Sequence, residues 1–458
     1  MSKKNRKLIS VLGSRNYVTV NYDGFDECEY IQEALIRKYK DKLSEVLIFA
    51  TSDAKEKNWN EYTYEDKNNK KITKMGLKKK IKKIQEEYGL NLEVRLVEIP
   101  EGYREEELWE IFNIFIENIN KNDKIYFDVT HGFRYLAMLI MNILNYVKLT
   151  KNIEVKSIEY GLFEQLGPSF KVVKMPLKER NATILDLTSF DYLNDWVVGV
   201  DNFVNTGDAD KINQLSGRPI GRMIAQDEKM NTESKELILK ISSLIDALKN
   251  FNNEVKTARG NILNNTIIKV LILLEEIEEF ESSSNNRISP LLKLIDKIKD
   301  KFSIFDKNDK KGINNYFQLL KWCEEHKFVQ QGLVIFKENM ISMIADKLNE
   351  PYLPEHMKKA DYNYSLIEIR EEIGNAIYSL NEKEKNFDPI TTQEKFNFIR
   401  NEIEKHFNDF IILYNNFSLK RNDVSHFGLR ESPTKNSQSI IDKFTIYTDA
   451  LEKILKKR

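Results

Sequence analysis

Residues 124–147, KIYFDVTHGFRYLAMLIMNILNYV, combine a predicted strand, a polar turn and a predicted helix. The short apolar run at 125–127 predicts a buried strand, and the apolar segment at 135–147 is too long for a strand and predicts a helix. Between them lies the glycine-containing turn DVTHGFR at 128–134. Because the first amide N–H groups of a helix have no intrahelical acceptor, this combination favours an anion-binding site. The alternative is an ordinary strand-to-helix turn in which Thr130 only caps the helix.

The flanking segments repeat this strand–helix order. Strands are predicted at 7–12, 46–50, 92–99 and 153–160, and helices at 30–39, 77–88 and 105–119. The polar residues 58–74 predict a loop. We therefore expect an α/β domain over residues 1–165, with a parallel sheet covered by helices on both faces. An edge hairpin and linker are expected at 166–186, with a short strand at 170–175.

Three polar turns follow predicted strands and reach the carboxyl edge of this sheet, where α/β folds bind ligands at the point of strand-order reversal. The candidate ligand-binding residues in these turns are Gly13, Ser14, Arg15, Asn16, Tyr17, Thr51, Ser52, Asp53, Thr130, His131, Gly132, Phe133 and Arg134. The assignment of 51–53 depends on edge position alone. The GxGxxG dinucleotide fingerprint and the GxxxxGK[ST] phosphate loop are both absent from the sequence, which disfavours a nicotinamide enzyme or an ordinary ATPase.

Composition restricts the possible partners. The 458 residues suffice for two or three domains, and 71 basic residues balance 71 acidic ones. A protein that binds long duplex nucleic acid usually carries a basic excess, so a nucleic-acid site here must be a local patch. Cys28 and Cys323 lie far apart and are predicted to be reduced thiols. With no signal-like apolar stretch and no segment long enough to span a bilayer, we expect a soluble, cytoplasmic protein without membrane contact.

Helical periodicity dominates from 187 to 458, which predicts an all-α region. Thr391 and Glu394 fit a capping box that starts a long helix ending near 415–418. His326, His356 and His406 lie among charged residues and are expected at the surface.

The motif RNDVSH at 421–426 contains the candidate catalytic residues Arg421, Asn422 and His426. In one regular helix, Arg421 and His426 would lie about 140° and about 7.5 Å apart, so they would share a cleft only if Arg421 sits at a helix end or a second subunit supplies the other wall. An arginine that holds a phosphate and a histidine that moves a proton can cleave RNA without metal, with the 2′-hydroxyl as nucleophile. The alternative is a capped helix with a surface histidine, because this spacing is common by chance.

The N-terminal half resembles the CARF domains of CRISPR-associated proteins, which are Rossmann-like sensors of cyclic oligoadenylate. LGSRNY at 12–17 and DVTHGFR at 128–134 carry this resemblance. RNDVSH resembles the R-x4-6-H signature of HEPN ribonucleases, including the polar residue that often follows the arginine. The order of these motifs matches the ancillary ribonucleases of type III CRISPR systems.

That resemblance implies a homodimer, or a higher oligomer, in which paired CARF domains bind cyclic tetra- or hexa-adenylate as an allosteric activator. It also implies a composite HEPN site with two Arg421 and two His426 that cuts single-stranded RNA and requires no metal or other cofactor. The segment 207–330 exceeds what a minimal HEPN bundle needs and is expected to be a helical insertion.

Two other functions compete with this one. A non-catalytic sensor would use its helical region to bind nucleic acid or a protein partner, and the Arg421/His426 pair argues against it. A nucleotide-metabolising enzyme would use the α/β edge, and the missing phosphate motifs argue against that.

Overall fold

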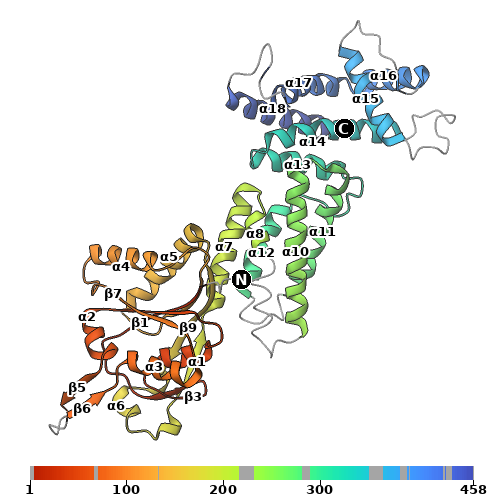
Figure 1. Ribbon diagram of the computed structural model, residues 1–458. Coiled ribbons are helices and arrows are strands. Elements are labelled where there is room, and N and C mark those ends of the chain that lie inside the picture. Colours follow the sequence, from red (N-terminus) through yellow and green to blue (C-terminus); the bar gives the residue numbers. More distant parts are fainter. Residues whose placement is uncertain are drawn as a thin grey trace. The chain divides into compact units, whose positions relative to one another are not determined.

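The computed structural model describes residues 5–65, 71–132, 134–215, 232–280, 289–349, 365–381, 389–390, 392–425, 429 and 436–456. The chain divides into two compact units, Met1–Tyr192 and Leu193–Arg458 (Figure 1). The first contains an eight-stranded sheet and the second is helical, as the sequence predicts.

Five parallel strands form the part of the sheet that determines the site. They are β1 (Arg6–Leu12), β4 (Glu45–Ala50), β7 (Glu93–Glu98), β8 (Lys124–Asp128) and β9 (Glu154–Leu162), in the order β9-β8-β1-β4-β7. From β1 the chain adds β4 and β7 on one side, and then returns to add β8 and β9 on the other. The strand order therefore reverses between β1 and β8, where such folds bind ligands.

The sheet is mostly parallel, as predicted, and two of its pairings are antiparallel. β10 (Asn181–Asp186) pairs antiparallel with β9 and parallel with β2 (Val20–Tyr22), and β3 (Phe25–Cys28) forms the edge. Within 166–186, the strand expected in an edge hairpin is β10, which is internal to the sheet and not at its edge. The strand expected at 170–175 is also wrong, since α6 (Ser169–Val172) forms there after Pro168, which has no amide hydrogen for a strand ladder.

Residues 58–74 are not a simple loop. A π-helical turn, η1 (Lys55–Trp59), follows the short α2 (Ser52–Ala54), and β5 (Tyr62–Glu65) pairs with β6 (Lys71–Lys74) as a separate hairpin. These strands are too polar to give an apolar pattern.

Helices cover both faces of the sheet (Figure 1). Leu8 and Leu12 of β1 pack in the core that contains residues of α1 (Ile31–Lys38) and α3 (Leu77–Tyr88). Ile9 and Val11 pack in the core that contains residues of α4 (Glu105–Glu117) and α5 (Arg134–Lys151). This alternation explains the continuous apolar runs, because parallel strands are buried on both faces.

A charged cluster is buried at the amino ends of the strands, opposite the predicted ligand edge. The Lys7 ammonium, which is fully buried, lies 3.2 Å from Glu45 Oε2 and 3.0 Å from Asp123 Oδ2. Arg95 Nη2 lies 2.6 Å from Glu45 Oε1. Two positive and two negative charges therefore compensate one another in this cluster, as burial of ionised groups requires.

The second unit forms around one hydrophobic core. The helices described in this half of the chain are α7 (Thr188–Thr206), α8 (Asp210–Gln214), α10 (Thr232–Lys256), α11 (Gly260–Glu278), α12 (Ser289–Phe302), α13 (Ile313–Glu325), α14 (Val329–Asn349), α15 (Ser365–Asn381), α16 (Gln393–His406), α17 (Asn408–Ser425) and α18 (Ser437–Lys456). α7 begins within the first unit and ends within the second. Among the described helices, none combines the length and apolar character that a membrane crossing needs.

Two details of the helical region correct the sequence predictions. The N-cap of α16 is Thr392, whose hydroxyl accepts from Lys395 N, and the predicted cap Thr391 lies outside the described residues. The single long helix is in fact two, α16 and α17, and α17 continues past 415–418 to Ser425.

The histidine prediction is partly wrong. His326 is buried and packs against Trp322, with ring centroids 4.6 Å apart. The charged neighbours that suggested exposure lie on the outer face of the same helix end. His406 is exposed as expected, and His356 lies outside the described residues.

Candidate functional site

The loops after β1 and β8 meet at the strand reversal. β1 and β8 pair in register up to Ser10 and Asp128, so their carboxyl ends are neighbours. The rings of Tyr17 and His131 make an edge contact, with centroids 4.7 Å apart. The structure thus brings together the two most specific sequence motifs, which lie more than a hundred residues apart in the chain.

Asp128, which sequence analysis did not select, shapes the turn after β8. Its Oδ1 accepts from Thr130 N at 2.9 Å and its Oδ2 accepts from Ser10 Oγ at 2.6 Å. Ser10 Oγ in turn accepts from Gln32 Nε2 of α1 at 2.8 Å. Burial raises the pKa of Asp128 to about 6. The sequence did contain a sign of this role, because Asp128 is the first residue of the DVTHGFR motif. However, no spacing rule distinguishes a residue that positions a turn from one that contacts the ligand.

Thr130 and Gly132 fix the backbone of the same turn. Thr130 Oγ1 accepts from Gly161 N of β9 at 2.8 Å, so its hydroxyl ties the turn to the sheet. Gly132 has φ +120°, and a Cβ there would lie 2.8 Å from Leu136 Cδ2. Only glycine fits this position without strain.

His131 is neutral at neutral pH. Burial lowers its pKa to about 4, and its Nε2 atom is buried with no hydrogen-bond partner in the described part of the chain. A neutral imidazole can donate from one nitrogen and accept at the other, so this group offers polarity without charge. Phe133 lies outside the described residues; Arg134 is the first residue of α5, and its side chain also lies outside them.

Asn58 of η1 supports the loop after β1. Sequence analysis did not select Asn58, because residues 58–74 were predicted to be a loop. Asn58 Nδ2 donates to Gly13 O at 2.8 Å and to Arg15 O at 3.0 Å. Gly13 N donates to the Tyr17 hydroxyl at 2.8 Å, which closes the loop on itself. Arg15 and Asn16 are exposed.

The third predicted turn supports this loop. Thr51 caps α2 by accepting from Ala54 N, and Ser52 is exposed. Asp53 pairs with Lys57 at 2.7 Å and bonds to Ser14, and the Lys57 and Ser14 hydrogen bonds lower the Asp53 pKa. β4, which leads into this turn, is separated from β8 by β1, so these residues lie one strand away from the reversal.

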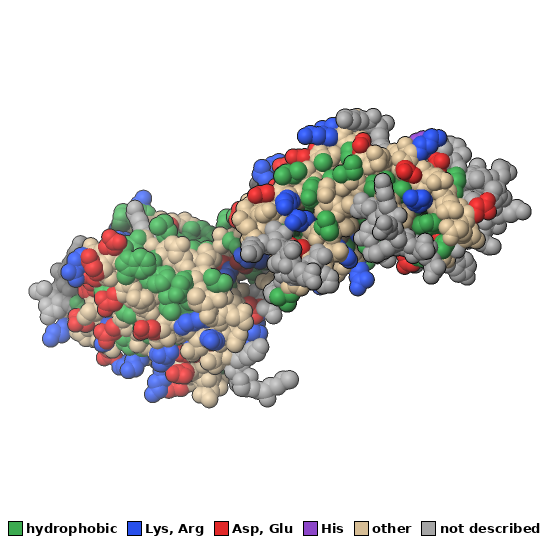
Figure 2. Space-filling model, turned by 90° about the horizontal axis from the view of Figure 1, so that it is seen from above, with side chains coloured by type: hydrophobic (Ala, Val, Ile, Leu, Met, Phe, Trp, Pro, Cys, Tyr) green, Lys and Arg blue, Asp and Glu red, His purple; other side chains and the backbone are tan. Residues whose placement is uncertain are grey.

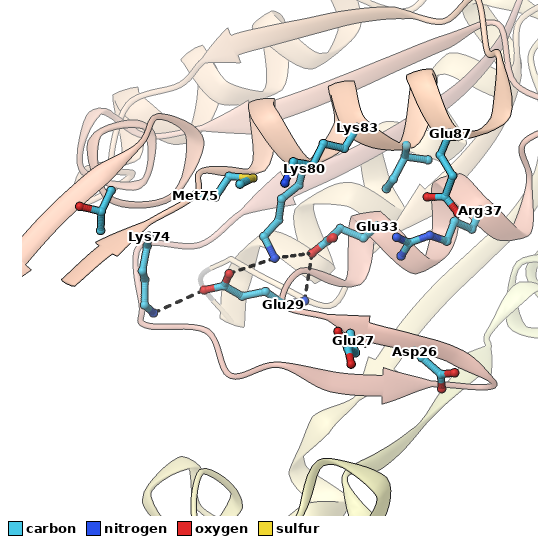
Figure 3. Close-up of a pocket in the computed structure, with 12 residues that line it drawn as sticks. Asp26, Glu27, Glu29, Glu33, Arg37, Lys74, Met75, Lys80, Lys83 and Glu87 are labelled. Carbon is cyan, nitrogen blue, oxygen red and sulfur yellow. Dashed lines mark hydrogen bonds and ion pairs between the residues drawn. The ribbon is translucent and has the colours of Figure 1, made fainter.

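Besides the loop site at the strand reversal, the first unit has a pocket of about 700 Å³, here called the second pocket. It lies between β3, α1, β6 and α3 (Figure 3). Glu29 lies 3.5 Å from Lys74 and 3.1 Å from Lys80, which also lies 3.3 Å from Glu33. Acidic and basic side chains thus neutralise each other on this wall. Lys74 Nζ also donates to Tyr17 O at 3.4 Å, which joins the pocket wall to the β1 loop.

In the second unit, Arg421 and Asn422 lie near the end of α17, where Arg421 Nη1 donates to Asn422 Oδ1 at 3.2 Å. Arg421 Nε is buried with no hydrogen-bond partner in the described residues. Burial raises the pKa of Tyr414 to about 12, against a smaller opposing effect of the Arg421 charge. His426 follows the last residue of α17 and lies outside the described residues. Across the described ranges, no three His, Cys, Asp or Glu side chains are grouped to hold a metal.

Comparisons with known proteins agree with the fold of the first unit. Residues 7–164 match the family model of the CARF domain of the CRISPR system endoribonuclease Csx1. The chain is 26% identical over 321 residues to a CRISPR-associated protein of Methanocaldococcus jannaschii, covering 67% of this chain and 43% of that one. It therefore spans less than half the length of this relative.

A structural comparison finds Csm6 of Enterococcus italicus, bound to cyclic hexa-2′-fluoro-hexa-dAMP. The TM-score is 0.43 at 14% identity, over 98% of this chain and 94% of that chain. The family model and the two joined loops both concern the first unit. Residues 7–164, which make up most of the α/β unit, therefore form a CARF domain.

Proposed function

We propose that this protein is a cytoplasmic RNA endonuclease of type III CRISPR defence that is activated by cyclic oligoadenylate. The observation that carries the proposal is the meeting of the 13–17 and 130–132 loops at the strand reversal of a CARF domain. The Csm6 structure found in the structural comparison contains a bound cyclic hexanucleotide analogue, so cyclic oligonucleotides are the ligand class to test.

The ligand site suits an oligonucleotide ring. Loop amides and the Arg15 and Arg134 charges would hold phosphates, because charge-assisted hydrogen bonds to phosphate are strong. The neutral His131 imidazole and the Tyr17 ring would contact adenine, since both offer a π-face and polar atoms.

The proposal includes a homodimer, because a two-fold axis presents the same groups twice to a cyclic ligand. The exposed positions of α5 support it: Ala137, Met138, Asn142, Asn145, Tyr146, Leu149 and Thr150 include no charged residue. Tyr146 contacts Phe112 of α4, and Phe112 in turn contacts Trp109, which is also exposed. Figure 2 shows hydrophobic side chains gathered on the face of the first unit that α4 and α5 form in Figure 1.

For cleavage, we assign the Arg421 guanidinium to a non-bridging phosphate oxygen and His426 to proton transfer. The RNA 2′-oxygen attacks the neighbouring phosphorus and the bond to the 5′-oxygen breaks, which leaves a 2′,3′-cyclic phosphate and a 5′-hydroxyl. One His426 accepts the 2′-hydroxyl proton and the second His426 of the dimer donates a proton to the leaving oxygen. Asn422 holds Arg421 through the hydrogen bond between them.

The test uses a fluorogenic single-stranded RNA in EDTA, with and without cyclic tetra- or hexa-adenylate. We expect cleavage with one ring only, lost by at least a hundredfold in His426→Ala, the order expected for a proton-transfer group. His406→Ala is the matched control, because His406 is an exposed histidine of the same helical unit, and its activity should be unchanged. Ring binding without any cleavage would instead support a non-catalytic sensor. Cleavage that requires added magnesium or manganese would contradict the metal-independent mechanism.

A further inference from the structure

Asn58 donates hydrogen bonds to two carbonyl groups of the β1 loop. We infer that Asn58 is a positioning residue that turns the amide N–H groups of Ser14 and Asn16 toward a bound phosphate. This inference rests on the proposed function, because it assigns the polar groups of the same site.

The argument begins with the two hydrogen bonds of one amide nitrogen. Asn58 Nδ2 has two hydrogens, and it donates to Gly13 O at 2.8 Å and to Arg15 O at 3.0 Å. Both carbonyls therefore point toward Asn58. In a planar trans peptide, the carbonyl of one residue and the N–H of the next point in opposite directions. The Ser14 and Asn16 N–H groups consequently point away from Asn58.

Those two amides are available to a ligand. Within the described residues, neither the Ser14 nor the Asn16 amide has an intramolecular acceptor. Ser14 is half-buried, and Asn16 and the intervening Arg15 are exposed, so the outer side of the loop is accessible. Two neighbouring amides beside an arginine form an anion-binding concavity.

Asn58 is itself fixed in place. Its side chain is only 3% exposed, and it belongs to the π-helical turn η1, a conformation common at functional sites. At Gly76, a Cβ would lie 2.3 Å from Trp59 O and 2.2 Å from Asn60 O, so the backbone before α3 packs directly against the end of η1.

The far end of the loop is held by the hairpin that follows η1. Lys74 Nζ donates to Tyr17 O at 3.4 Å and lies 3.5 Å from Glu29, as the wall of the second pocket (Figure 3). The segment between β4 and α3 thus contacts the β1 loop at both ends, and it leaves the Ser14 and Asn16 amides accessible. This supports a positioning role for Asn58.

The substitution Asn58→Asp tests the inference, because the isosteric carboxylate places oxygen against both carbonyls. We expect ring affinity to fall by at least about tenfold, the order expected when two hydrogen bonds that hold a binding loop are lost. The ring concentration for half-maximal RNA cleavage should rise by the same factor, with the cleavage rate at saturating ring unchanged. A residue that only stabilises the fold would not produce this split.

Asn21→Asp is the matched control. Asn21 is also buried, and its Nδ2 donates to Leu177 O at 3.0 Å and to Asn181 Oδ1 at 3.1 Å, away from the loop. Its ring affinity should stay within about twofold of the wild type. Equal weakening in both variants, or wild-type affinity in Asn58→Asp, would overturn the inference.

A second readout separates this inference from the proposed function. If the wild-type protein binds neither ring, the proposed function fails, and hydrogen exchange of the ring-free protein then decides the role of Asn58. The Gly13 amide donates to the Tyr17 hydroxyl, and its exchange should be faster in Asn58→Asp than in the wild type or Asn21→Asp. Unchanged exchange would mean that Asn58 does not hold the loop.

Discussion

At the scale of single residues, Asp128 and His131 have pKa values shifted in opposite directions by the same burial. Burial raises the pKa of Asp128 from 3.8 to about 6 and lowers that of His131 from 6.5 to about 4. Between pH 4 and 6 the folded protein therefore holds an extra proton on Asp128 and one proton fewer on His131, relative to the unfolded chain. The turn after β8 can thus stay nearly uncharged through this range.

This opposition predicts two pH profiles of opposite sign. The stability from Asp128 is present at low pH and is lost as pH rises through about 6, whereas the stability from neutral His131 is lost as pH falls from about 6.5 toward 4. Relative to the wild type, the free energy of unfolding of Asp128→Asn should increase as pH rises from 4 to 6, by about 2 to 3 kcal/mol. That of His131→Gln should increase as pH falls over the same range. Urea unfolding at several pH values measures both, and parallel profiles would refute the opposition.

At the scale of secondary-structure elements, the sequence predicted the strands on either side of the strand reversal. It did not predict the elements that support the loops there. The long apolar runs of β1, β4 and β8 mark strands buried on both faces, and the turns after them contain the right residue types. β2, β3, β5 and β6 are short or polar, so their pairing depends on tertiary contacts that no local pattern reports. Asn58 was missed for this reason, since it lies in a segment that reads as a loop.

The helical region shows the same limit. The apolar positions from Phe396 to Tyr414 continue at helical spacing across Phe407. The hydrophobic pattern therefore does not predict the break between α16 and α17. Arg421 was selected from its motif, yet its position inside α17 follows from packing of that helix against α14 and α18.

Gly332 of α14 permits that packing. A Cβ at Gly332 would lie 2.2 Å from Phe444 Cζ of α18, and Phe444 is buried beside Phe417 of α17. We expect Gly332→Ala to lower the free energy of unfolding by about 1 to 3 kcal/mol, because overpacking outweighs the better helix propensity of alanine. It should also reduce RNA cleavage, because α17 carries Arg421.

The control is Gly374→Ala in α15, where the nearest atom to the added Cβ is Tyr414 Oη at 3.9 Å. This variant should be as stable as the wild type or more stable, by up to about 1 kcal/mol. Chemical denaturation monitored by circular dichroism compares the two. Equal effects would show that helix propensity, rather than the Phe444 contact, decides the result.

At the scale of the whole molecule, activation requires two chains if the proposal is correct. Leu149 is the most exposed of the large hydrophobic residues on the α5 face, and it lies about 22 Å along the helix from Arg134. We expect Leu149→Glu to convert a dimer into a monomer in sedimentation and to abolish ring-activated cleavage at nanomolar protein. The substitution places charge among described α5 positions whose fully exposed members carry none.

Leu239→Glu on α10 alters a comparably exposed leucine of the other unit and serves as the control. Its sedimentation and activity should match the wild type. A Leu149→Glu protein that remains dimeric would exclude this face as the contact between copies.

The buried charges of Lys7, Glu45 and Asp123 have a consequence for how this family of sequences diverges. Loss of the Lys7 charge would leave the buried Asp123 and Glu45 carboxylates without the ammonium they share, a change that costs several kcal/mol. Lineages should therefore pass through such intermediates rarely. Homologous sequences are expected to keep all three positions, or to replace them together with apolar residues, so that these sites are inherited as a block.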